Sequence, residues 1–257
     1  MKILAITNQK GGVGKTTTAV NLAAGLAAQG SRVLLIDLDP QGNATTGCGI
    51  TKKEALPTVY QLLLGIASLR EVCLGTEFGF DLLPANRELA GAEVELIEIE
   101  RREYRLRDAL TSSHADYDFV LIDCPPALNM LTVNGLVAAD AVLIPMQCEY
   151  YALEGLSDLV ETLRKVRAHL NSRLEIEGLL RTMYNPQSTL TQQVSAELER
   201  HFGDKVYQTI VPRNVRLAEA PSYGKPVMAF DKNSKGAQSY MNLAEEILAR
   251  SQRGKTA

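Results

Sequence analysis

The chain has little of what marks secreted, metal-binding or membrane-spanning proteins. Its four cysteines are scattered through 257 residues without a C-x-x-C pair, so neither a zinc site nor a disulfide framework is expected. No apolar stretch approaches the roughly 20 residues of a membrane span. The opening "MKILAITNQK" has too short an apolar run for a signal peptide. We therefore expect a soluble, cytoplasmic protein with reduced thiols and no membrane partner.

Aromatic residues and net charge are also scarce, and both bear on nucleic-acid binding. The chain has no Trp and only 5% aromatic residues, which leaves little to stack on the bases of a single strand. The formal net charge is −3, but residues 201–257 hold nine Lys or Arg against five Asp or Glu. A basic face can therefore exist within a mildly acidic protein.

Short runs of branched apolar residues alternate with longer helical patterns along the chain. This alternation predicts an α/β fold with a mostly parallel, twisted sheet and helices on both faces, formed as one domain over residues 1–257. Strands are expected at 2–7, 32–37, 80–84, 117–123, 141–145, 178–183 and 206–210. Helices are expected at 19–27 and 153–170, with an exposed helix or helix pair in the charged segment 88–110. We expect a flexible tail of about seven residues at the C-terminus.

The string "KGGVGKTT" at residues 10–17 separates the first expected strand from the first helix. A glycine-rich turn in this position points backbone N–H groups into one concavity at a helix N-terminus, where phosphate binds. The expected phosphate ligands are the backbone of Gly11, Gly12, Val13 and Gly14, the Lys15 ammonium and the Thr17 hydroxyl. The Thr16 hydroxyl is placed to ligate Mg²⁺.

Two further strands end in acidic residues. "RVLLIDLDPQGN" carries Asp37 and Asp39, and "YDFVLIDCPP" carries Asp123. Ligands of open α/β sheets bind outside the carboxyl ends of the strands, so these carboxylates should lie near the glycine turn. We predict a Mg-nucleotide site in which Thr16, Asp39 and Asp123 serve the metal, Asp123 through its water ligands.

Six strings between Met1 and Arg250 resemble one known family: "KGGVGKTT", "LLIDLDPQGNAT", "LAGAEVEL", "LIDCPP", "QCEYYALEGL" and "VPRNVRLAEAPSYGKP". They are similar to the ParA/Soj partitioning ATPases, members of the deviant Walker A group of P-loop ATPases. The resemblance implies ATP and Mg²⁺ as cofactors, ATP hydrolysis and an ATP-dependent homodimer. It also implies binding to nonspecific double-stranded DNA on the nucleoid, and release when a ParB-type partner stimulates hydrolysis.

The resemblance also assigns roles to particular residues. Lys10 would cross a two-fold interface to the phosphates held by the partner subunit, as a cation acting in trans beside Lys15. Asp39 would position the attacking water, so the expected catalytic residues are Lys10, Lys15 and Asp39. Gly11 would lie where the two backbones meet, and Pro212 and Asn214 would contact the adenine base.

Duplex DNA binding is expected from basic residues in the C-terminal part. Arg213 and Arg216 lie in the matching "VPRNVR" string, and Lys225 follows. Related proteins usually carry an arginine in the stretch that reads "YNPQSTL" here, where this chain has Gln187. Arg181, on the preceding strand, is a candidate to compensate for that difference.

Two other functions remain open from the sequence. A membrane-associated positioning ATPase resembling MinD would end in a basic amphipathic helix. The C-terminal segment here carries Glu245 and Glu246 between its apolar residues, and we expect it to pack on the domain. An electron-transfer protein resembling the nitrogenase iron protein would share an Fe–S cluster between subunits, with Cys124 and Cys148 as the thiolates to consider.

Overall fold

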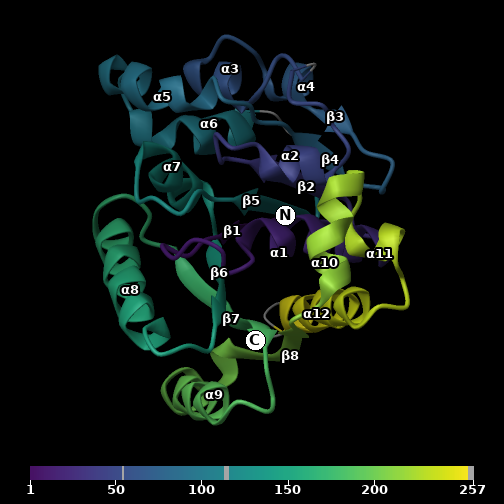
Figure 1. Ribbon diagram of the computed structural model, residues 1–257. Helices are drawn as coiled ribbons and strands as arrows, with labels where there is room; N and C mark the ends of the chain where they lie inside the picture. Colours follow the sequence, from purple (N-terminus) through teal and green to yellow (C-terminus); the bar gives the residue numbers. More distant parts are fainter. Residues whose placement is uncertain (54, 113–115, 254–257) are drawn as a thin grey trace.

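A computed structural model describes residues 1–53, 55–112 and 116–253, which form an α/β fold around one eight-stranded sheet (Figure 1). The strand order is β3-β4-β2-β5-β1-β6-β7-β8, and each neighbouring pair is parallel except β3–β4. The strands are β1 (Lys2–Ile6), β2 (Val33–Asp37), β3 (Leu74–Gly75), β4 (Asp81–Leu83), β5 (Phe119–Asp123), β6 (Ala141–Gln147), β7 (Glu175–Tyr184) and β8 (Val206–Pro212). The seven expected strands are confirmed. The short antiparallel β3 was not predicted, because two residues are too few to show a period.

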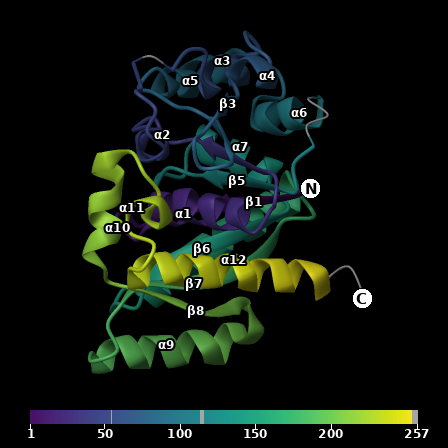
Figure 2. The same cartoon turned by 90° about the vertical axis from the view of Figure 1, so that its right-hand side faces the viewer.

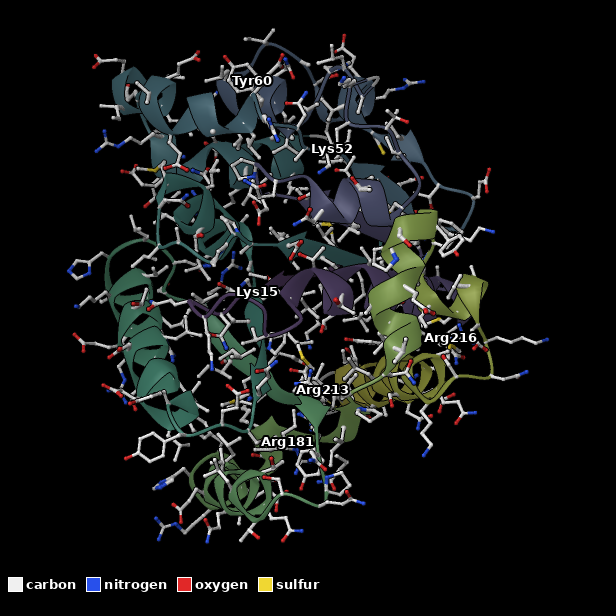
Figure 3. The ribbon with its side chains drawn as sticks, viewed as in Figure 1. Lys15, Lys52, Tyr60, Arg181, Arg213 and Arg216 are labelled. Carbon is white, nitrogen blue, oxygen red and sulfur yellow. The ribbon has the colours of Figure 1, made fainter. Side chains whose placement is uncertain are left out.

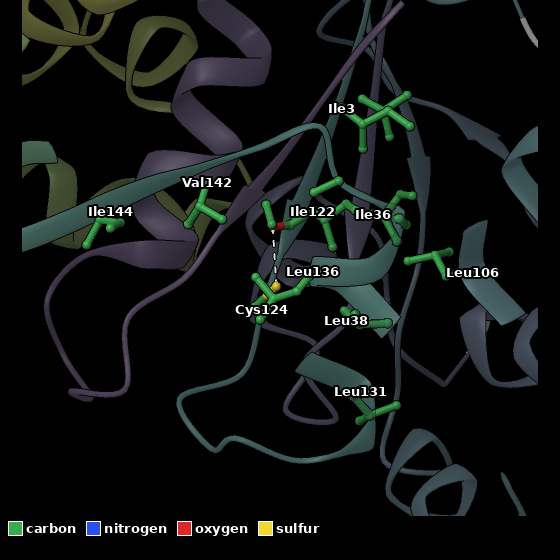
Figure 4. Packing of buried hydrophobic residues seen from close by; sticks show 14 of the residues in the cluster. Ile3, Ile36, Leu38, Leu106, Ile122, Cys124, Leu131, Leu136, Val142 and Ile144 are labelled. Carbon is green, nitrogen blue, oxygen red and sulfur yellow. Dashed lines mark hydrogen bonds between the residues drawn. The ribbon is translucent and has the colours of Figure 1, made fainter. Parts of the chain in front are cut away.

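Helices cover both faces of the sheet, as predicted. One face is covered by α1 (Lys15–Ala28), α2 (Asn43–Gly47), α10 (Val215–Glu219), α11 (Val227–Phe230) and α12 (Lys235–Arg253). The other is covered by α3 (Val59–Leu64), α4 (Leu69–Val72), α5 (Leu89–Glu95), α6 (Arg105–Ser112), α7 (Met130–Ala138), α8 (Ala152–His169) and α9 (Thr189–Phe202). Successive side chains of each strand point to opposite faces of the sheet and therefore pack into different cores. Leu4 packs under α1. Ile3 packs on the other face, on the side of α7 (Figure 4).

The charged segment 88–110 is built differently from the expected exposed helix or helix pair. It forms α5, two short 3-10 turns (Leu96–Glu98 and Arg102–Tyr104) and the start of α6. Its apolar residues Leu89, Leu96 and Leu106 are fully buried, whereas the charged residues and two apolar ones, Val94 and Ile97, face water. The apolar residues recur at helical spacing, and this periodicity outweighs the high overall charge.

The C-terminal helix α12 packs on the body of the domain, as expected. Tyr240, Leu243 and Ile247 are buried in the core shared with α1 (Figure 2). Residues 251–253 end α12, and the rest of the expected flexible tail lies outside the described residues. No described helix combines the length and apolar composition that a membrane crossing requires.

A hydrogen bond between the Thr18 and Tyr240 hydroxyls, 3.0 Å long and fully buried, links α1 to α12. We predict that Tyr240→Phe lowers the free energy of unfolding by about 1 kcal/mol, since the bond is lost while ring packing is kept. Urea unfolding would measure the change, with Tyr150→Phe as control because Tyr150 is 74% exposed. Equal midpoints for Tyr240→Phe and the wild type would show that this bond adds no net stability.

Candidate functional site

The glycine turn lies at the carboxyl end of β1, the strand between β5 and β6, and leads directly into α1 (Figure 1). Gly12 and Gly14 have φ of 74° and 89°, a left-handed conformation that residues with a Cβ rarely adopt. Gly14 precedes α1 without any side-chain cap. The first N–H groups of the 14-residue helix are therefore free to bind an anion.

Side chains from distant strands hold the turn in place. Thr182 on β7 donates its hydroxyl to the Val13 carbonyl at 2.8 Å. Asn8 donates its amide to the Pro145 carbonyl of β6 at 2.9 Å. These residues were missed in the sequence, because they are more than 130 positions from their partners and no local motif marks them. The turn is therefore fixed by the ends of β6 and β7 as well as by its own glycines.

The two lysines of the turn point in different directions. Lys15, labelled in Figure 3, is buried beside the turn, and its ammonium group donates to the Lys10 carbonyl at 3.0 Å. Burial lowers the pKa of Lys15, and the charges of Asp123 and Asp39 oppose that shift. The Lys10 side chain is 45% exposed and forms an ion pair with Glu149 at 2.6 Å, in the segment between β6 and α8. Lys15 thus faces the cradle, and Lys10 lies outside it.

Asp123 ends β5 directly beside Asp37, which ends β2 in the same register. It is 1% exposed, and neither of its oxygens makes a hydrogen bond of normal geometry with a described residue. Burial raises the pKa of Asp123 well above its usual value, although the Thr16 hydroxyl is near enough to lower it. A buried carboxylate with unsatisfied oxygens fits a hydrated cation, so Thr16 and Asp123 are suitable residues for Mg²⁺.

The two acidic residues of "LIDLDPQ", Asp37 and Asp39, have different environments. Asp37 is fully buried and accepts hydrogen bonds from the Thr45 amide at 2.8 Å and hydroxyl at 2.7 Å, which anchors α2. Burial raises the pKa of Asp37 to about 6. Asp39 is only partly buried and accepts one bond, from the Gln41 amide at 2.9 Å. Its charge affects the pKa of both Lys15 and Asp123, which places it at the same edge of the sheet.

The residues expected to contact adenine lie where β8 meets α10. Pro212 is the last residue of β8, and the Asn214 side chain caps α10 by accepting from the Leu217 amide at 3.3 Å. This capping bond is a sufficient local reason for an asparagine at the start of a helix. Adenine contact by Pro212 and Asn214 stays a prediction.

The three residues predicted to bind DNA have different surroundings, and two of them, Arg213 and Arg216, are labelled in Figure 3. Arg213 is exposed and makes no ion pair within the described part of the chain. Arg216 forms ion pairs with Glu219 at 2.8 Å and Asp231 at 3.2 Å, so its charge is already partly neutralised. Lys225 lines a cavity of about 300 Å³ together with Thr16 and Thr17, next to the phosphate turn. Arg213 is therefore the best placed of the three for a phosphate backbone.

Arg181 is excluded as a substitute for the arginine that Gln187 replaces. Its side chain is 6% exposed, donates to Ser195 Oγ at 2.8 Å and to the Tyr207 carbonyl at 2.7 Å, and pairs with Glu199. These bonds join β7 to α9 and β8. Gln187 itself is exposed.

The two thiols considered for a shared cluster are both interior. Cys124 is 1% exposed, and its sulfur would lie 2.9 Å from a Cβ added at Gly135 in α7 (Figure 4). Cys148 is 4% exposed. Burial raises the pKa of both thiols, which opposes the thiolate form that iron requires. This arrangement disfavours an Fe–S cluster held between subunits.

The chain is similar to known partitioning proteins over nearly its whole length. A family described as an AAA domain matches residues 1–176. A chromosome partitioning protein ParA of Caulobacter vibrioides is 53% identical over 253 residues, 97% of this chain and 95% of that protein. The sporulation initiation inhibitor protein Soj of Bacillus subtilis is 54% identical over 249 residues, 96% of this chain and 98% of that protein.

Solved structures show the same fold. A cobyrinic acid a,c-diamide synthase from Mycobacterium smegmatis, with bound ADP and magnesium, gives a TM-score of 0.87 at 37% identity, covering 99% of this chain and 96% of that one. The septum site-determining protein MinD from Pyrococcus horikoshii, complexed with Mg-ADP, gives 0.79 at 26% identity, covering 96% and 95%. MinD is thus a more distant relative than the partitioning proteins.

The environment of Asp123 leads to a prediction for Asp123→Asn. Its pKa is raised on folding from an ordinary 3.8, so the folded state binds the proton more tightly than the unfolded state. Stability is therefore lost as pH rises above about 4, because the ionised carboxylate is buried without a hydrogen bond of normal geometry from any described residue. The variant should match or exceed the wild-type free energy of unfolding at pH 7, and this advantage should shrink toward pH 4. Magnesium-dependent nucleotide affinity should fall about 10- to 100-fold.

Urea unfolding between pH 4 and 8 and nucleotide titrations with and without Mg²⁺ would check both parts. Asp158→Asn is the matched control, because Asp158 is exposed on α8. A variant that is less stable than the wild type at pH 7, or that keeps its magnesium-dependent affinity, would contradict the assignment of Asp123.

Proposed function

The chain belongs to the ParA/Soj family of chromosome-partitioning ATPases, and on that premise we propose that it is an ATP-driven switch for DNA segregation. Mg·ATP closes a homodimer, the dimer binds nonspecific duplex DNA of the nucleoid, and a ParB-type partner stimulates hydrolysis and release. The observation that carries this proposal is the division between the two lysines. Lys15 faces its own phosphate cradle, whereas Lys10 lies outside the cradle on the exposed side of the turn.

ATP and Mg²⁺ are the cofactors that the site fits. The Lys15 ammonium would hold the β- and γ-phosphates, and the N–H groups of Gly11 to Gly14 would surround them. Thr16 would ligate the metal directly and Asp123 would hold one of its waters, while Thr17 would reach the α-phosphate region. The ion would neutralise charge on the β- and γ-phosphates.

Hydrolysis would need one residue that positions the attacking water and one that stabilises the negative charge developing on the phosphates. Asp39 is a partly exposed carboxylate at the same edge as Lys15, with one oxygen bonded to the Gln41 amide. It could accept a hydrogen bond from the attacking water. Lys10 from the partner subunit would stabilise negative charge as the bond to the γ-phosphate breaks.

For Lys10 to serve a partner, it must leave Glu149. Both side chains of that ion pair are about half exposed, at 45% and 51%. Exposed pairs of this kind contribute only about 0 to 1 kcal/mol, because solvent screens the charges. A triphosphate offers more negative charge in a less hydrated place, so the exchange would be favourable.

Gly11 supports an interface at the turn. Its φ lies outside the left-handed region, and a Cβ built on it meets no atom of the described residues within 4 Å. Within one chain, a side chain would therefore be tolerated at this position. The requirement for glycine would come from a second copy that approaches the same backbone.

DNA binding would depend on phosphate contacts rather than base readout. Arg213 is the leading candidate because no described carboxylate neutralises it, whereas Arg216 would have to give up Glu219 and Asp231. Lys225 beside Thr16 and Thr17 suits a role near the nucleotide as well as near DNA. We place the protein in the cytoplasm, associated with the nucleoid.

A MinD-like role at a membrane surface has less support. The apolar residues of α12, among them Tyr240, Leu243 and Ile247, are already buried against the domain. A helix that inserts into a bilayer would need this face free. We propose no membrane partner.

The turn glycines provide a test of the dimer. Gly11→Val should bind ATP with near wild-type affinity but remain a monomer with a non-hydrolysable ATP analogue, because the side chain blocks only the partner. Gly12→Val should instead lose nucleotide affinity, since a branched residue is strained at a φ of 74°. Analytical ultracentrifugation and nucleotide titration would separate the two effects. A normal analogue-bound dimer of Gly11→Val, or a wild type that stays monomeric, would refute the clamp.

DNA binding can be tested with matched arginine variants. Arg213→Ala should weaken ATP-dependent binding to a nonspecific duplex and reduce the slope of log K against log salt by about 1 for each DNA phosphate that the arginine neutralises. Arg216→Ala should have a smaller effect, because that charge is already paired. Arg200→Ala on α9, which pairs with Glu197, is the control. Fluorescence anisotropy at several salt concentrations measures all three, and an unchanged slope for Arg213→Ala would place the DNA surface elsewhere.

A further inference from the structure

We infer that the cavity between α3, α4 and α6 is a second binding site, for a small amphipathic anion. By this we mean a carboxylate or phosphate carried on an apolar body. The cavity has a volume of about 730 Å³, within the range of small-molecule sites. Tyr117, which lines it, precedes β5, whereas Asp123 of the phosphate site ends the same strand. The two sites therefore lie at opposite edges of the sheet, and this inference does not depend on the proposed function.

The wall of the cavity is largely apolar. Leu62 of α3 and Leu69 of α4 contribute side chains that also belong to the main core. Cys73, after α4, and Ala109 of α6 are partly buried and belong to the same lining. Helices α3, α4 and α6 lie together above the sheet in both views (Figures 1 and 2). This part of the lining can bury an apolar body of moderate size.

Two guanidinium groups and one carboxylate line the cavity. Arg70 and Arg105 line it, and neither forms an ion pair with a carboxylate in the described ranges. The one acidic residue on the lining, Asp108, is taken by Arg101 at 3.0 Å and Arg107 at 3.7 Å. The cavity therefore presents unpaired positive charge, and arginine binds carboxylates and phosphates through paired N–H donors.

The Arg105 side chain is held in a fixed position at the cavity. Its Nε donates to the Leu63 carbonyl at 2.8 Å, so the terminal amino groups are left to bind elsewhere. Gly65, which ends α3 in the left-handed conformation, lies so close that an added Cβ would be 2.6 Å from a terminal nitrogen of Arg105. The hydrogen bond to Leu63 and the close approach of Gly65 restrict the Arg105 side chain before any ligand binds. This restriction lowers the entropy cost of binding.

Tyr117 and Cys73 are further polar residues of the lining, and both are already engaged. The Tyr117 hydroxyl donates to Asp81 Oδ2 at 2.6 Å and lies 3.5 Å from the Cys73 sulfur. Neither residue therefore competes with the arginines for an anion. Cys73 is also the only one of the four cysteines that is not buried, so it can report on occupancy.

The test is protection of Cys73 in the full-length protein, with decanoate as the probe. The rate of iodoacetamide alkylation at Cys73 would be followed by peptide mass spectrometry at fixed pH. Decanoate, kept below its micelle concentration, should slow alkylation in a saturable manner. Decanol has the same chain length without charge and should protect at least about tenfold less well, which is about 1.4 kcal/mol of recognition.

Variants then test the arginines. Arg105→Gln should raise the decanoate concentration for half protection at least about tenfold, and Arg105→Lys should restore part of the loss. Arg70→Gln is a second variant that avoids any folding defect, because Arg70 is exposed and makes no bond to the described core. Arg200→Gln on the exposed side of α9 is the control.

Three outcomes would overturn the inference: no protection by decanoate, equal protection by decanol, or unchanged protection in both arginine variants. The second would describe an apolar groove without anion recognition. None of these results would affect nucleotide binding or dimerisation, so failure here is distinguishable from failure of the proposed function.

Discussion

The site depends on one electrostatic constraint: a lysine and two carboxylates are buried together where the central strands end. Asp37 and Asp123 are register neighbours on β2 and β5, and Lys15 begins the helix that follows β1. Burying like charges side by side is costly, and burial raises the pKa of both acids. Asp37 meets this cost with hydrogen bonds from Thr45, whereas Asp123 has none of normal geometry with a described residue. A hydrated cation bound to phosphates would supply the hydrogen bonds and positive charge that the Asp123 carboxylate lacks among the described residues.

The glycine turn beside these charges is fixed on one side and exposed on the other. Thr182 and Asn8 tie the glycine turn to β6 and β7, so the cradle is formed before any ligand binds. Lys10 and Gly11, by contrast, face solvent: Lys10 is held by an exposed ion pair, and a Cβ on Gly11 would meet no described atom within 4 Å. Under the proposed mechanism, the rigid side binds the nucleotide, and the open side detects a second copy of the chain.

At the opposite edge of the sheet, the charge without a partner is positive instead of negative. There, Arg70 and Arg105 carry positive charge beside an apolar cavity, and no described carboxylate neutralises them. Uncompensated charge next to a concave surface is thus found at both ends of β5. Because the two ends are separated by the length of the strand, they can be tested separately.

The sequence by itself determined the local features: seven strands, the glycine turn, and the acids that end β2 and β5, because each depends on short-range spacing and backbone preferences. The family resemblance in the sequence also implied that Lys10 reaches away from its own phosphate cradle, toward a partner subunit. Tertiary structure alone decided which charges are paired. Arg181 is buried, Arg216 is partly neutralised by Asp231, and Thr182 holds Val13 from a strand far along the chain. Such pairings depend on how strands and helices stack, and sequence spacing carries no record of which side chains of different elements meet.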